Sequence, residues 1–189
     1  MLVVDTGHQF LSPHFLRALI LAEDKRYFSH LGFDSIAVAR AIWSLLFRRK
    51  LQGASTIEQQ LVRTVTRRYE ITVARKLREI LLASVLSASF PKDQMARAYL
   101  SVAYFGWQMN GVRQACKRLS VDPMTATAVQ AAQIIARLKY PEPDEASPKR
   151  LMQIQNRAHH ILRLQRASNN LDQMQRGYNA PITQYKNRQ

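Results

Sequence analysis

The hydrophobic positions along the chain recur at the spacing of a helix face and do not alternate as they would in a strand. After Ser12 and Pro13, which suit a helix start, apolar side chains fall at helical spacing at Phe15, Leu16 and Leu19. The same spacing, interrupted by Gly and Pro, predicts further helices over residues 34–49, 55–67, 71–90, 92–105, 122–138 and 149–166. We therefore expect an all-α fold.

Polar residues mark where these helices should begin and end. Ser55 and Glu58 have the three-residue spacing of a capping box, and Asp122 is placed to cap a later helix. Gly106 should end the helix over 92–105. We expect one domain over residues 1–167. From residue 168 to 189 the chain is polar and weakly periodic, which predicts a loosely held tail or a partner-binding extension.

The charge balance points to an anionic partner. Lys and Arg number 28 against 13 Asp and Glu, giving a formal net charge of +15. Such a surface attracts nucleic acid, an anionic membrane face or a phosphorylated substrate, and the charge alone does not choose among them. The single Cys116 excludes an internal disulfide. No apolar run is long enough for a membrane span, and the first residues do not form a signal peptide.

Glu23 is the first candidate for chemistry. It follows Leu19 by four residues and Ile20 by three, so it lies on the apolar face of its helix. A partly buried carboxylate suits a general acid or base. The alternative is a helix-end acid that pairs with Lys25 or Arg26.

Glu79 is the second candidate, within a long apolar helix. Arg75 and Lys76 precede it by four and three residues and can reach its face, and Arg78 is adjacent. The alternative is an ordinary ion pair within the helix. Two carboxylates on either side of a reacting sugar bond are usual in glycosyl chemistry, so we consider Glu23 and Glu79 together.

The stretch from 53 to 63 could hold an anion or a sugar. A Gly-Ala break leads into a helix N-terminus, where free backbone N–H groups favour negative charge. Amide and cationic side chains follow, and the polar residues of the stretch are Ser55, Thr56, Gln59, Gln60 and Arg63. The alternative is a capped helix with surface glutamines.

A dense apolar cluster bordered by basic residues suggests contact with a membrane interface. Its members are Ile42, Trp43, Leu46 and Phe47, and Arg48 follows them. An ordinary core helix is the alternative. His30 could act as a base or a ligand, but we find no partner at metal-binding spacing and predict no metal site. A hydrogen-bonding role in the structure is its other interpretation.

Taken together, four stretches resemble the peptidoglycan glycosyltransferase domain of bifunctional penicillin-binding proteins and monofunctional transglycosylases. "EDKRYFSHLG" resembles the family's Glu-Asp-x-x-Phe-x-x-His-x-Gly motif, with Phe28 as the aromatic residue and Tyr27 in the earlier aromatic position. "GASTIEQQ" resembles Gly-Gly-Ser-Thr-x-x-Gln-Gln, "RKLRE" matches Arg-Lys-x-x-Glu, and "ARAYLSVAYFG" resembles a motif around Tyr-Leu-Asn. The order and intervals agree over about residues 12–165.

The resemblance implies a lysozyme-like, two-lobed helical domain with a cleft, and a definite reaction. The enzyme would polymerise lipid II with inversion at the anomeric carbon and release undecaprenyl diphosphate. Glu23 would be the general base. Glu79 would assist the leaving diphosphate directly or through a divalent cation such as Mg or Mn. By position, the substrate contacts would be Phe28, His30, Ser55, Thr56, Gln59, Gln60, Arg63, Arg75, Lys76 and Arg78.

Four positions depart from the family pattern. Arg63 stands for a usual Lys and Ile71 for a usual Arg, which removes one expected phosphate contact, while Gln94 and Ser101 replace a Glu and an Asn. The implied partners are lipid II, the nascent glycan strand, an anionic membrane surface and other cell-wall synthesis proteins, with no nucleic acid. The implied location is the extracytoplasmic face of a bacterial cytoplasmic membrane, with the usual anchor not present in this chain. The alternatives are a lysozyme-like hydrolase and a non-enzymatic basic module that binds membrane or nucleic acid.

Overall fold

The structure, a computed structural model, describes residues 11–36, 55–70 and 72–178, with side chains placed to residue 170. Over these residues the chain is helical and contains no strands, which confirms the all-α prediction. The elements are α1 (Pro13–Glu23), the short 3₁₀ helix η2 (Tyr27–Ser29), α3 (Ile57–Thr66), α4 (Val73–Ser89), α5 (Lys92–Val102), α6 (Val112–Arg118), α7 (Ala128–Lys139) and α8 (Pro148–Tyr178).

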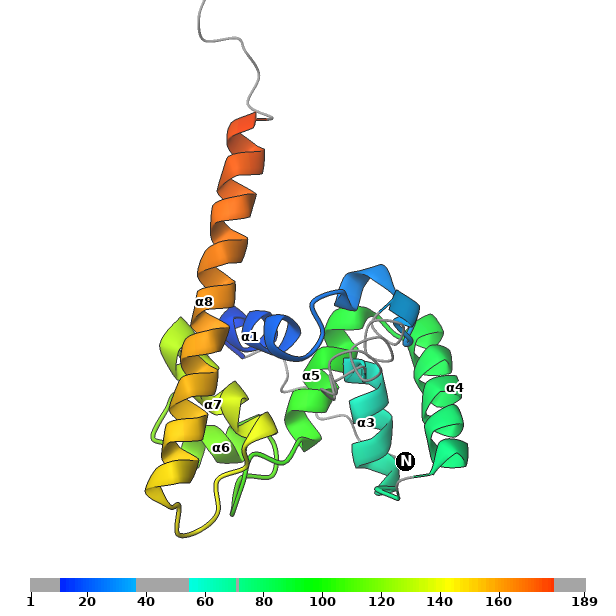
Figure 1. Cartoon of the computed structure of the whole chain (residues 1–189), viewed down its shortest axis with the longest axis horizontal. Helices are drawn as coiled ribbons and strands as arrows, with labels where there is room; N and C mark the ends of the chain where they lie inside the picture. The colour runs from blue at the N-terminus through cyan, green and yellow to red at the C-terminus, as the bar shows by residue number, and fades with distance from the viewer. Residues whose placement is uncertain (1–10, 37–54, 71, 179–189) are drawn as a thin grey trace, which may run out of the picture.

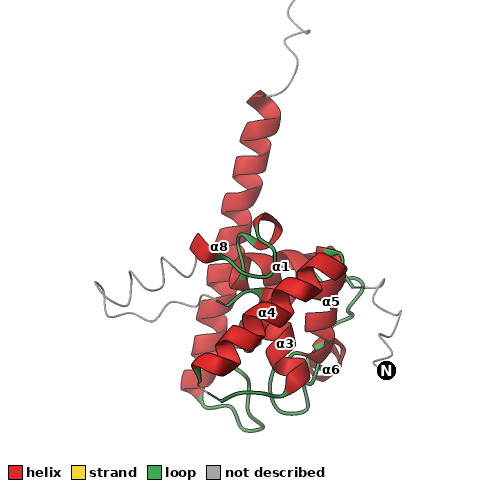
Figure 2. Cartoon of the chain, turned by 90° about the vertical axis from the view of Figure 1, so that its right-hand side faces the viewer, coloured by secondary structure: helices red, strands yellow, loops and turns green. Residues whose placement is uncertain are grey.

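The helices form two packed groups (Figure 1). In one group α7 packs on α1, α6 and α8, and in the other α3 packs on α4 and α5. Helix α5 also contacts α1 and α6, so it joins the groups. Figure 2 shows α4 on the outer side of the second group. Large side chains that are fully buried in the core include Phe15, Leu19, Leu100, Phe105, Ile134, Ile135 and Ile161.

The loop after η2 lies directly on the backbone of α4. Gly32 adopts a positive φ of 76°, and a Cβ atom added there would lie 2.4 Å from the carbonyl oxygen of Ala83. Only glycine combines this backbone conformation with such a close approach. Gly32 therefore determines where the segment that follows α1 and η2 contacts α4.

Two helices begin one or more residues later than predicted. The N-cap of α3 is Thr56, whose hydroxyl accepts the backbone N–H of Gln59, so the predicted capping box at Ser55 is wrong by one residue. Helix α7 begins at Ala128 behind a capping box formed by Thr127 and Gln130. The predicted start at Asp122 is wrong because that carboxylate instead accepts hydrogen bonds within a turn that precedes the helix.

The predicted helix over 92–105 ends early. Helix α5 stops at Val102, and the next residues form hydrogen bonds within their own loop and with the loop around Glu142. The Phe105 N–H donates to the Met109 carbonyl, and its own carbonyl accepts from Glu142. Helix α6 follows this loop and was not predicted, because its seven residues are too few to give a clear period.

Two predicted segments extend past what the structure describes. Ser35 and Ile36 are helical, but the rest of the predicted helix over 34–49 lies outside the described residues. At the other end, the boundary predicted at residue 167 does not coincide with a helix end, since α8 continues to Tyr178. Figure 1 shows this last part of α8 projecting beyond the two packed groups.

Candidate active site

Glu23 lies at the C-terminal end of α1, and residues from two distant helices contact its carboxylate. The Arg157 side chain of α8 places Nη2 3.2 Å from Oε1, and the Gln60 amide of α3 donates to Oε2 over 3.4 Å. Among the described residues, Glu23 pairs with Arg157 and not with Lys25 or Arg26, and Arg26 forms its ion pair with Asp34. The Glu23 side chain keeps 18% of its surface exposed, so a substrate could reach it.

The Gln60 amide is itself oriented by Tyr99. The Tyr99 hydroxyl donates to Gln60 Oε1 over 2.7 Å, which leaves the NH₂ group of the amide facing Glu23. Burial raises the pKa of Tyr99 well above its usual range, and the nearby Glu23 carboxylate adds to this shift. The phenol therefore stays protonated and remains a donor. Tyr99 comes from the stretch that resembles the Tyr-Leu-Asn motif, but its role at the site was not predicted.

Glu79 is buried on α4, and the predicted contacts with Arg75 and Lys76 are confirmed. Arg75 Nη1 pairs with Oε2, and Lys76 Nζ lies 3.0 Å from Oε1. The same ammonium group donates to Ser55 Oγ over 3.0 Å and to Gln59 Oε1 over 2.6 Å. These three acceptors match the three donors of an ammonium group. Lys76 therefore ties α4 to the start of α3.

Two consecutive glutamines connect the two acids. Gln60 contacts Glu23 directly, while Gln59 accepts from Lys76, which in turn pairs with Glu79. Both acids, 56 positions apart in the sequence, thus lie against the first turns of α3. This supports the expectation that they are neighbours in one site.

A cavity of about 310 Å³ lies between α3 and α4 beside Glu79. It is lined by Val62, Arg63, Thr66, Arg68, Arg75, Arg78, Glu79 and Leu82. The predicted substrate contacts Arg63, Arg75 and Arg78 are all among these residues, whereas Arg68 was not predicted. Glu23 does not line this cavity, so the cavity contains one of the two acids, and a cleft shared by both stays a prediction.

The residues around Glu79 do not fit a divalent cation. Such a cation is usually held by several oxygen ligands. Both Glu79 oxygens already accept from cationic side chains, Arg75 on one and Lys76 on the other. Glu79 is also the only carboxylate among the residues lining the cavity. We therefore derive no step of the reaction through a metal ion.

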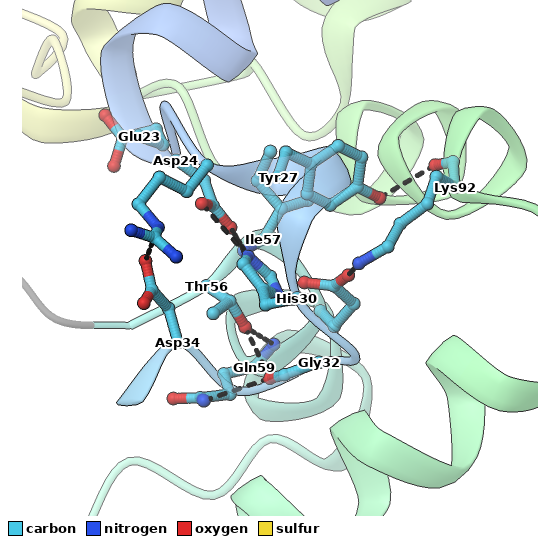
Figure 3. A network of polar contacts seen from close by, with 12 residues as sticks. Glu23, Asp24, Tyr27, His30, Gly32, Asp34, Thr56, Ile57, Gln59 and Lys92 are labelled. Atoms are coloured by element: carbon cyan, nitrogen blue, oxygen red, sulfur yellow. Dashed lines mark hydrogen bonds and ion pairs between the residues drawn. The ribbon is translucent and has the colours of Figure 1, made fainter. Parts of the chain in front are cut away.

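A buried polar brace ties the exit of α1 to the start of α3 (Figure 3). His30 Nε2 lies 3.0 Å from Asp24 Oδ2, and the same oxygen accepts the backbone N–H of Ile57 over 3.2 Å. The His30 side chain is only 4% exposed and does not line the cavity. Its geometry fits the structural interpretation of His30 and does not support the predicted substrate contact.

A second part of the brace involves a fully buried acid. Glu58 pairs with Lys92 of α5, and the Lys92 ammonium lies 4.6 Å from the centre of the Tyr27 ring. Asp24, His30 and Glu58 offer ligand atoms within 4.8 Å of one another. The two acids accept from His30, Ile57 and Lys92, so the cluster braces the helices. Among the described residues, His30 Nδ1 and Glu58 Oε2 are buried without a hydrogen-bond partner.

The aromatic residue of the first motif is Tyr27 and not Phe28. Tyr27 is fully buried and donates its hydroxyl to the Lys92 carbonyl over 2.7 Å, whereas Phe28 is 70% exposed and lies outside the cavity lining. Tyr27 follows Glu23 by four residues, which is the spacing of the aromatic position in the motif, so the motif position belongs to Tyr27. A substrate contact by the exposed Phe28 stays a prediction.

Thr56 and Gln59 also have internal roles. The Thr56 hydroxyl and the Gln59 amide both donate to the carbonyl of Gly32, at 2.9 and 3.1 Å (Figure 3). Both side chains are buried, so their geometry does not support direct substrate contact. The predicted membrane residues Ile42, Trp43, Leu46 and Phe47 lie outside the described residues.

Comparison with known proteins identifies the family of this chain. Residues 4–166 match the model of the transglycosylase family. Penicillin-binding protein 1A of Rickettsia conorii is 32% identical over 139 residues, which cover 71% of this chain and 18% of that relative. Penicillin-binding protein 1A of Mycobacterium tuberculosis is 32% identical over 139 residues, covering 71% and 17%. Penicillin-binding protein 1F of Bacillus subtilis is 36% identical over 99 residues, covering 52% and 14%.

These relatives are much longer than the chain. The chain spans less than a fifth of the length of each of these relatives. The family match, by contrast, extends over most of the chain and includes both acids and the arginines of the cavity. The chain therefore belongs to the transglycosylase family, whose domain is helical and lysozyme-like.

Proposed function

We propose that this chain is a peptidoglycan glycosyltransferase that polymerises lipid II into glycan strands. The observation that carries the proposal is that Glu23 of α1 and Glu79 of α4 both lie against the first turns of α3, with an arginine-lined cavity beside Glu79. A sugar bond activated by a diphosphate needs a base for the attacking hydroxyl and positive charge for the leaving group.

In the proposed reaction, the 4-hydroxyl of the acceptor attacks the anomeric carbon of the donor. Glu23 takes the hydroxyl proton as the new C–O bond forms. The bond from the anomeric carbon to the diphosphate breaks, and the lipid diphosphate leaves with the electron pair. Attack opposite the leaving group inverts the configuration. Of the two hydrogen bonds to the Glu23 carboxylate, the one from Gln60 to Oε2 is longer and weaker than the one from Arg157 to Oε1. Oε2 is therefore the oxygen available to the hydroxyl of the acceptor sugar.

Glu79 would act on the leaving group through its neighbours. By pairing with Arg75 and Lys76 it fixes both cations at the start of α4. Arg75 has five donors, of which one contacts Glu79 and one the Glu70 carbonyl, so others remain for phosphate oxygens. Fixed positive charge that faces a developing negative charge lowers the barrier without reorganisation at the moment of reaction.

We further propose that the protein works against an anionic membrane surface on the extracytoplasmic side. Val73, Leu77, Leu81 and Val85 form a row on α4 at four-residue spacing, and each is more than half exposed. No helix among the described residues is long and apolar enough to cross a bilayer. Cosedimentation with anionic vesicles tests this proposal. If the apolar cluster predicted at Ile42, Trp43, Leu46 and Phe47 contacts the membrane, Trp43→Ser should weaken vesicle binding. Unchanged partitioning would remove Trp43 from the contact.

The test of the proposed function is incubation with labelled lipid II, followed by gel separation with and without a muramidase. A ladder that the muramidase degrades is the expected result. A protein that instead shortens preformed glycan strands would be a hydrolase. Absence of both activities, together with salt-sensitive binding to DNA that Glu23→Gln leaves unchanged, would identify a basic binding module.

A further inference from the structure

The Tyr99 hydroxyl selects which end of the Gln60 amide faces Glu23. An amide group fits the same space in two orientations that exchange its oxygen and its NH₂ group. Tyr99 is 5% exposed, and within the described part of the chain its hydroxyl has one hydrogen-bond partner, Gln60 Oε1. If the amide turned over, the phenol would lose this acceptor, and the amide oxygen would face the Glu23 carboxylate. Two acceptors would then meet without a hydrogen between them.

The amide orientation affects the charge state of Glu23. In the observed orientation Gln60 donates to Oε2, while Arg157 donates to Oε1. A hydrogen bond donated to a carboxylate favours its ionised form, whereas an acceptor in the same place favours the protonated form. A general base has to be ionised before it can take a proton. A neutral amide can therefore influence the lowest pH at which the proposed base still works.

Several ionisable groups surround this pair of contacts. Arg157 of α8 pairs with Glu23, and Arg63 of α3 and Tyr69 lie near Tyr99. The residues that follow Glu23 in the sequence are Asp24, which contacts His30, and the exposed Lys25. Replacing Tyr99 by Phe or Gln60 by Met removes none of these charges. A change in the pH dependence of such a variant therefore reports the hydrogen bonds and not a lost charge.

We propose that Tyr99 is a positioning residue for the proposed base, because it holds the Gln60 amide with its NH₂ group on Glu23 and so keeps Glu23 ionised to lower pH. The contact runs through three helices, from Tyr99 on α5 to Gln60 on α3 and Glu23 on α1. Helix α5 packs on both α3 and α1, so the hydroxyl is held in place from both sides. This inference rests on the proposed function, because it concerns the base of the same reaction.

The pH dependence of kcat/KM for lipid II polymerisation tests the proposal. Tyr99→Phe removes the hydroxyl and keeps the ring. The acid limb of the profile should move about 0.5–1 pH unit higher, since a hydrogen bond of ordinary strength to the carboxylate is lost for part of the time. An acid limb at the wild-type pH would overturn the proposal.

A double variant shows whether Tyr99 acts through Gln60. Gln60→Met removes the amide and should move the acid limb in the same direction. Adding Tyr99→Phe to Gln60→Met should then shift the limb by less than about 0.2 pH unit, because no amide remains to be oriented. If the two shifts add in the double variant, Tyr99 acts by another route and the proposal is refuted.

Tyr27 provides a matched control. It is also buried, and its hydroxyl donates over the same distance of 2.7 Å, but to the Lys92 carbonyl. Tyr27→Phe should lower the free energy of unfolding about as much as Tyr99→Phe and leave the acid limb in place. If Tyr27→Phe moves the limb as far as Tyr99→Phe does, a general loss of packing explains both, and the proposal fails.

A titration without substrate separates this inference from the proposed function. Glutamate labelled with ¹³C at the side-chain carboxyl reports the ionisation of Glu23 by NMR, with Glu23→Gln identifying the signal. The Glu23 signal should titrate at higher pH in Tyr99→Phe than in the wild type. If the wild type makes no polymer yet this difference appears, the proposed function fails and the role of Tyr99 stands. If it makes polymer and the two proteins titrate at the same pH, the role of Tyr99 is refuted.

Discussion

Arg157 Nη2 donates to the carboxylate of Glu23 over 3.2 Å and to the backbone carbonyl of Ala22 over 2.7 Å, although 134 residues separate Arg157 from Glu23. The Ala22 carbonyl belongs to the last turn of α1, where carbonyls lack partners within the helix. One guanidinium therefore holds both the helix end and the carboxylate that it presents. This makes Arg157 a positioning residue for the proposed base.

We expect Arg157→Met to lower the kcat for lipid II about tenfold with little change in KM, because the carboxylate loses its orientation and its charged donor. The free energy of unfolding should fall by about 1–2 kcal/mol, measured by urea denaturation. Arg166→Met, at an exposed position on the same helix, is the control. A normal kcat in Arg157→Met would show that Glu23 is positioned without it.

Glu23→Gln should slow polymerisation about 10²- to 10⁴-fold while binding of lipid II persists, since the amide keeps the shape of the side chain but cannot accept the proton. Initial rates and equilibrium binding should be measured on the same preparation. Full activity in this variant would remove Glu23 from the mechanism.

Glu79→Gln should lower the rate by more than about tenfold, which corresponds to roughly 1.4 kcal/mol of barrier. The substitution leaves Arg75 and Lys76 without their shared carboxylate, so both cations lose their fixed positions. Single-turnover rates with labelled lipid II provide the measurement. A smaller effect would reduce the Glu79 contacts to a structural ion pair.

Gly32→Ala should destabilise the fold by more than about 2 kcal/mol, because the new methyl group meets the Ala83 carbonyl at 2.4 Å and the φ is positive. Thermal and urea unfolding report this loss. Ser29→Ala, at an exposed position at the end of η2 just before this loop, is the control and should stay close to wild type. Equal stability of the two variants would mean that the loop is free to move away from α4.

Cys116 should be almost unreactive in the native protein. Its side chain is buried, and burial raises the pKa of the thiol to about 11. The thiol therefore stays protonated at pH 8, where an exposed cysteine would be partly ionised and reactive. Labelling with a thiol reagent at pH 8 should be slow without urea and complete in urea. Rapid labelling of the native protein would contradict this burial.

Helical periodicity was sufficient to predict the class of fold and most of the helices, because each apolar face is a local property of residues three and four apart. Errors arose at helix ends. Asp122 and Thr127 both have side chains that can cap a helix, and only the packed structure selects Thr127. The short α6 gave too little periodic signal to be found.

The sequence alone determined the two acids and their local partners, since the contacts of Glu79 with Arg75 and Lys76 follow from helical spacing within one turn. The tertiary structure alone decided which distant groups reach them. Arg157, Tyr99 and Arg68 carry no local pattern that distinguishes them from other surface or core residues. Their places depend on how α8, α5 and the end of α3 pack, and spacing along one helix contains no information about contacts between helices.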